Sequence, residues 1–125
     1  MHPLREQVKR FLIGTGQRCA LCGGVATSLH EVVCSLRHKY DPVEEDEPLA
    51  RIVYLPQNCV LLSPRCNVEI GGGASRRDDL IAFNMELYGV TAVVGCYRSM
   101  AKLLKSPTSW IPSTVTFKGK EVRIL

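Results

Sequence analysis

The sequence predicts an α+β fold in which a thiol pair, two short strands and a helix form one unit. The first observation is the tight pair of Cys19 and Cys22, which two glycines follow. The second is an apolar stretch over residues 29–35 that carries two polar side chains. The third is another apolar stretch, residues 59–63, which runs into Pro64 and a further cysteine. Together they indicate a metal-dependent site built from two hairpin strands and a helix.

The length of 125 residues corresponds to one domain over residues 1–125. Within it we expect a core at 17–72, a helical tail at 75–105 and a C-terminal hairpin at 113–125. No apolar run near the start is long enough for a signal peptide or a membrane span. We therefore expect a cytoplasmic protein whose six cysteines stay reduced.

Helices are predicted on both sides of the core. Pro3 suits the first helical position, and apolar residues at helical spacing extend this helix to Ile13. A short helix is expected over 65–70. Two longer helices are predicted over 75–88, which a capping-box variant opens, and over 91–105. The inner side of the helix over 75–88 is predicted to carry Leu80, Ile81, Asn84, Leu87 and Tyr88.

The remaining segments are predicted as strands and a loop. Two prolines interrupt residues 36–50, which predicts a polar loop between the paired strands. A loop of that length in a small domain is more often functional than idle. A short strand is expected over 52–55, at the far end of the loop. Residues 114–117 and 121–124 alternate in polarity around Lys118-Gly119-Lys120, which predicts a hairpin.

Taken in order, these features resemble the HNH endonucleases, in particular the small HNH proteins common in phages and prophages. The family pattern is a Cys-x2-Cys pair, a strand with a His-containing pair, an Asn before a second strand, another Cys-x2-Cys pair, and a His or Asn at the following helix. The matching positions here are Cys19, Cys22, His30, Glu31, Asn58, Ser63, Cys66 and Asn67. The resemblance covers residues 15–105 and implies a ββα-metal core with a zinc knuckle, to which the N-terminal helix, two C-terminal helices and a hairpin are added.

The resemblance implies a structural zinc ion bound by Cys19, Cys22 and Cys66. The chain departs from the pattern at Ser63, where the family usually has a cysteine. A neutral hydroxyl is a poor zinc ligand, so the fourth ligand stays open. Its candidates are Cys59 and Cys34, although a small buried residue is the favoured interpretation of each of them. A degenerate site without metal is the other alternative.

The resemblance also implies a DNA endonuclease or nickase that hydrolyses phosphodiester bonds with one Mg²⁺ or Mn²⁺. His30 and Asn67 would bind that ion, and Glu31 stands where the family usually has its histidine base. A one-residue shift would make His30 the base instead, and His38 is a further candidate. Asn58 would hold the base in register through the loop backbone.

The implied partner is DNA, and no membrane is expected. The net charge of +4 is mild and favours solvated faces and nucleic-acid contact about equally. Arg37, His38 and Lys39 are the candidate nucleic-acid contacts, which would bind phosphates with little sequence preference. A homodimer or a protein partner stays open, and the compartment would be the host cytoplasm for a phage-encoded chain. The alternative function is a catalytically degenerate HNH module that binds DNA or a protein, with Ser63 and Glu31 as signs of lost chemistry.

Overall fold

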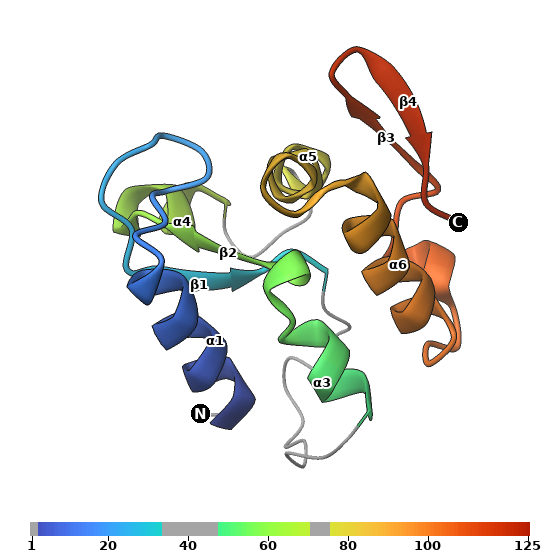
Figure 1. Ribbon diagram of the computed structural model, residues 1–125, viewed down its shortest axis with the longest axis horizontal. Helices are drawn as coiled ribbons and strands as arrows, with labels where there is room; N and C mark the ends of the chain where they lie inside the picture. Colours follow the sequence, from blue (N-terminus) through green and yellow to red (C-terminus); the bar gives the residue numbers. More distant parts are fainter. Residues whose placement is uncertain (1–2, 34–47, 71–75) are drawn as a thin grey trace.

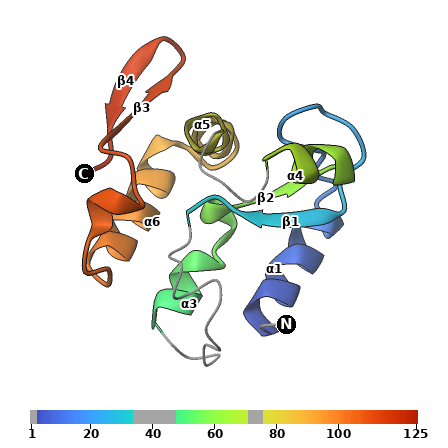
Figure 2. The same cartoon turned by 180° about the vertical axis from the view of Figure 1, so that it is seen from behind.

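A pair of short strands lies at the centre of the N-terminal part of the chain in the computed structural model, which describes residues 3–33, 48–70 and 76–125. Figure 1 shows helix α1 on one side of the pair and helix α4 on the other, with α5, α6 and a second hairpin beyond them. The view from behind in Figure 2 shows the same arrangement. The fold is therefore mixed α+β, as the sequence predicts. Within the three described ranges, no helix has the length and apolar character that crossing a membrane requires.

The two central strands are antiparallel, and their register divides the side chains between two faces. Strand β1 spans Ser28–Glu31 and strand β2 spans Cys59–Leu62. His30 lies opposite Val60, and Glu31 lies opposite Cys59. Because successive side chains of a strand point to opposite faces, His30 and Glu31 face opposite sides of the pair. Of the apolar stretch over 29–35 that was expected to supply the first strand, the described residues form a strand only as far as Glu31.

Helix α1 (Pro3–Gly14) covers the first face of the strand pair. Its apolar stripe buries Val8 and Leu12, as the helical spacing predicts. These two residues form a small hydrophobic cluster with Leu29, Cys59 and Leu61. The predicted N-terminal helix is therefore confirmed, and its apolar side is used to cover the strands.

The second face contributes to the main core. Helix α4 (Pro64–Ile70) packs on both strands, and α5 (Arg77–Tyr88) packs on α6 (Val90–Ala101). The predicted positions of these helices are confirmed, although α6 ends four residues before the predicted Lys105. The prediction for Leu87 was wrong: this side chain is 51% exposed, and Met85 is buried in α5.

The segment before β2 differs from its prediction. Residues 52–55 were expected to form a strand, whereas helix α3 spans Pro48–Val53 and the 3-10 helix η1 spans Pro56–Asn58. Pro48 stands at the first helical position, where its missing N–H is not needed. The buried residues of α3 are Leu49, Ala50 and Val53, and this spacing is helical.

The C-terminal hairpin is confirmed. After the 3-10 helix η2 (Pro107–Ser109), strand β3 (Thr114–Phe117) pairs with β4 (Lys120–Arg123) and contacts α5. Lys118 and Gly119 connect the strands with φ values of 52° and 76°. Positive φ at both central residues is the geometry of a type I′ turn, which matches the twist of paired strands.

We expect Gly119→Ala to destabilise the protein by about 1 kcal/mol, because an alanine at positive φ is strained. Gly95→Ala is the matched control, since Gly95 lies inside α6 and an added Cβ there meets no atom within 4 Å. That change should stabilise the protein by about 0.5–1 kcal/mol through helix propensity. Urea unfolding of the two variants beside the parent chain measures both values. A loss of stability in both variants, or in neither, would contradict this account of the turn.

Candidate metal centre

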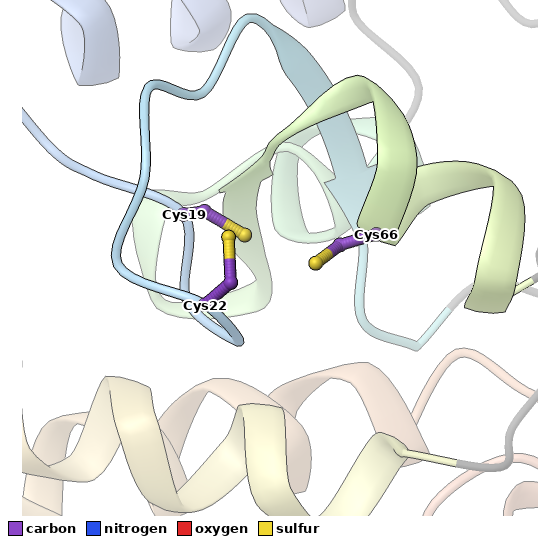
Figure 3. A group of neighbouring side chains, drawn as sticks. All are labelled: Cys19, Cys22 and Cys66. Carbon is purple, nitrogen blue, oxygen red and sulfur yellow. The ribbon is translucent and has the colours of Figure 1, made fainter.

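Three thiols meet where the loop before β1 reaches the start of α4. The sulfur atoms of Cys19, Cys22 and Cys66 all lie within 4.8 Å of one another. Figure 3 shows the sulfur atoms of Cys19 and Cys22 next to each other, with the Cys66 side chain pointing toward them from α4. In a tetrahedral zinc site with Zn–S bonds of about 2.3 Å, the sulfur atoms are roughly 3.8 Å apart. A small movement is therefore enough for these three residues to hold a metal ion such as zinc.

The backbone around the first two cysteines is a tight turn attached to the strand pair. The Gly23 N–H donates to the Cys19 carbonyl, and the Cys19 N–H donates to the Gly24 carbonyl, both at 2.9 Å. Gly23 has a φ of 74°, a value that favours glycine. The Ala20 N–H donates to the Leu61 carbonyl of β2 at 3.1 Å, which holds the turn against the sheet.

The surroundings of the thiols change their pKa values in opposite directions. Burial raises the pKa of Cys19, but the N–H groups of Ser63, Cys22 and Leu21 and the Cys22 side chain lower it to about 6. The Ser63 hydroxyl lowers the pKa of Cys66, but burial and the two neighbouring thiols raise it above the usual value of 9.0. Cys19 is thus favoured as a thiolate near neutral pH, and the thiolate is the form that binds metal.

The structure rejects one of the two candidates for a fourth metal ligand. Cys59 was a candidate, but it lies on the α1 face of β2, fully buried among apolar residues. Its thiol donates to the Val53 carbonyl at 3.4 Å. Because the strand alternation directs Cys59 away from α4, it is not a ligand of this cluster, and its interpretation as a small buried residue is confirmed. The residue that does approach the cluster is Ser63, whose Oγ lies 3.6 Å from the Cys22 sulfur.

Asn58 is a fully buried polar residue whose side chain bridges three segments. Its Oδ1 accepts hydrogen bonds from the Val33 N–H at 2.9 Å and from the Tyr97 hydroxyl at 3.0 Å. Its Nδ2 donates to the Val33 carbonyl at 2.8 Å and to the Val53 carbonyl at 2.9 Å. Both donors and both acceptor positions of the amide are therefore used. Burial raises the pKa of Tyr97 well above its usual value, which keeps this hydroxyl a donor.

The predicted catalytic pair is divided between the two faces of the strand pair. His30 is half-buried on the face that α4 covers, and Asn67 is half-buried on α4 beside the buried Cys66. Glu31 lies on the opposite face, where its Oε1 is 3.0 Å from Nε of Arg5. The structure thus brings His30 and Asn67 to one side and places Glu31 on the other.

Two residues that organise this region were missed as such from the sequence. Arg5 of α1 pairs with Glu31 and also donates to the Leu29 carbonyl at 3.1 Å. Asn84 of α5 is fully buried, and its Nδ2 donates to the carbonyls of Gln57 and Cys59, both at 3.1 Å. An asparagine on the apolar side of a helix was the available signal for Asn84, because a buried amide needs partners.

Four predicted residues lie outside the described ranges, namely Cys34, Arg37, His38 and Lys39. Comparisons of the chain with protein families, with curated proteins and with solved structures found no match.

We expect Asn58→Ala to destabilise the protein by about 3 kcal/mol or more, because it leaves several buried polar groups of Val33, Val53 and Tyr97 without their partner. Tyr97→Phe is the graded control, since it removes one of these hydrogen bonds and should cost about 1 kcal/mol. Chemical denaturation of both variants tests the order of the two effects. An equally small loss of unfolding free energy in both variants would mean that the Asn58 amide contributes no more to stability than the single Tyr97 hydrogen bond.

We expect the purified chain to bind zinc with a stoichiometry of one, measured by elemental analysis and by competition with a chromogenic chelator. Cys22→Ala should weaken this binding by about 100-fold or more, because it removes a thiolate ligand. Cys96→Ala is the matched control: Cys96 is buried in α6, where burial raises its pKa to about 12. Equal affinity of the two variants would contradict the assignment of the thiol cluster.

Proposed function

We propose that the chain is a metal-dependent DNA endonuclease of the HNH type, which hydrolyses phosphodiester bonds. The observation that carries this proposal is that His30 and Asn67 belong to the same side of the strand pair, with α4 directly after β2. The side-chain oxygen of Asn67 suits a hard divalent ion, since Mg²⁺ accepts an amide oxygen together with waters and substrate phosphate oxygens. A bound Mg²⁺ or Mn²⁺ would stabilise the charge on the scissile phosphate and on the leaving oxygen.

We assign proton acceptance to His30 rather than to Glu31. The Glu31 carboxylate is engaged by Arg5 on the α1 face, away from Asn67. An imidazole side chain such as that of His30 is the most common general base in enzymes. Asn67 would then contribute its side-chain oxygen to the divalent ion, as the resemblance implies.

Asn58 supports this arrangement from within the core. Its amide joins Val33, two residues after β1, to Val53 at the end of α3. It also directly precedes β2, so it holds β1 and β2 together at the end where His30 and Glu31 lie. The side chain that accepts the proton is therefore attached to a strand whose end is fixed by buried hydrogen bonds.

A second candidate function is a module that binds DNA or a protein without catalysis. The observation that favours it is the ion pair of Glu31 with Arg5, in which the residue at the family's base position attaches helix α1 to the strand pair. In this alternative, the thiol cluster and Asn58 stabilise the fold and take no part in catalysis.

The test is relaxation of a supercoiled plasmid by the purified protein with Mg²⁺, with Mn²⁺ or with EDTA. We expect metal-dependent nicking that falls by about 100-fold or more in His30→Ala and in Asn67→Ala. Glu31→Gln should keep most of the activity, because Glu31 is assigned to the ion pair. Glu69→Gln is the matched control on α4, since its side chain is 62% exposed and pairs with Arg65.

Two results would change the proposal. A complete loss of nicking in Glu31→Gln with an unchanged circular dichroism spectrum would return the base to Glu31. Absence of nicking with every metal, in a folded protein that retains plasmid DNA in a mobility-shift assay, would favour the non-catalytic module.

A further inference from the structure

Ser63 contacts every thiol of the cluster formed by Cys19, Cys22 and Cys66. Its Oγ lies 3.6 Å from the Cys22 sulfur, and its hydroxyl also faces the Cys66 thiol. Its backbone N–H faces the Cys19 thiol. The hydroxyl therefore lies beside two of the three thiols, and the backbone of the same residue lies beside the third. An oxygen is thus adjacent to a three-thiol cluster, and a closed structural zinc site needs a fourth ligand beyond these three thiols.

The same hydroxyl caps the N-terminus of helix α4, and this capping hydrogen bond is compatible with metal binding. The Cys66 N–H donates to Oγ of Ser63 at 3.2 Å, which is the hydrogen bond of a serine N-cap. A hydroxyl has two acceptor lone pairs. One lone pair can accept the N–H while the other faces the metal.

We propose that the Ser63 hydroxyl is the fourth donor of the metal centre, and that this oxygen vertex exchanges with small ligands such as imidazole. The site would then hold zinc through three thiolates and one weak oxygen ligand. A neutral hydroxyl competes poorly with an imidazole nitrogen for zinc, so an incoming ligand can displace it. This inference concerns the structural metal and does not depend on nuclease activity.

The vertex is open to such a ligand from solvent. Cys22 is exposed and Ser63 is only half-buried. A Cβ added at Gly24 would lie 3.4 Å from the Cys22 sulfur, so the glycine keeps a side chain away from this exposed thiol. The other two thiols, of Cys19 and Cys66, are buried and form the closed side of the site.

Cobalt substitution provides the test, because the intensity of the sulfur-to-cobalt charge-transfer bands follows the number of bound thiolates. We expect the parent chain to give the intensity of three thiolates and a spectrum that imidazole shifts. Ser63→Cys should raise the intensity by about one third, bind cobalt about 10-fold more tightly and abolish the response to imidazole. Ser63→Asp, which retains both an N-cap and an oxygen donor, should keep the three-thiolate intensity.

Ser63→Ala separates metal binding from capping alone. If the hydroxyl is a ligand, this variant should show an altered cobalt spectrum and weaker cobalt binding. An unchanged spectrum, affinity and imidazole response in Ser63→Ala would overturn the proposal and leave Ser63 as a helix cap only. A Ser63→Cys protein that is folded by circular dichroism but has no added charge-transfer intensity would place the fourth vertex elsewhere and also overturn it.

Discussion

The hydrogen bonds of the buried Asn58 side chain are the interaction on which the surrounding structure depends. They join the backbone after β1, the end of α3 and the Tyr97 hydroxyl of α6. A neutral amide suits this position, because two donors and an acceptor oxygen face two carbonyls, one N–H and one hydroxyl. An apolar residue of the same size would leave those groups buried without partners, which is the costly case in a protein core. Position 58 therefore requires the chemistry of an amide as well as its volume.

Successive side chains of β1 and β2 point to opposite faces of the strand pair, and the two faces have different surroundings. One face, under α1, is a small apolar cluster closed at its edge by the ion pair of Arg5 and Glu31. The other face, under α4, carries His30 and adjoins the thiol cluster and the main core. Residues that are neighbours in the sequence, such as His30 and Glu31, therefore contact different elements. The register of β1 against β2 decides which of them lies on the same side as α4.

The sequence predicted correctly those helices and turns that depend mainly on residues close to one another in the chain. The apolar spacing of α1 and the Lys118-Gly119 turn depend on near neighbours, and both were predicted correctly. The helical nature of α3 was missed because Pro48 was taken as a break, although proline favours a first helical position. The thiol cluster was also predicted, because the family pattern already groups Cys19, Cys22 and Cys66. The pairing of Glu31 with Arg5 could not be predicted, since 26 residues separate the partners and only the docking of α1 brings them together.

The contacts between the thiol-bearing turn and α4 have a consequence for how the chain folds. Cys22 and Ser63 are 41 residues apart, and the pairing of β1 with β2 closes a loop that is nested within this one. The chain entropy of that closure is lost once, whichever event comes first. A metal ion that binds the unfolded chain would bring the strands together and accelerate their pairing. One that arrives later finds its thiols already gathered, so the order of metal binding and strand pairing would decide whether the metal changes the folding rate or only the final stability.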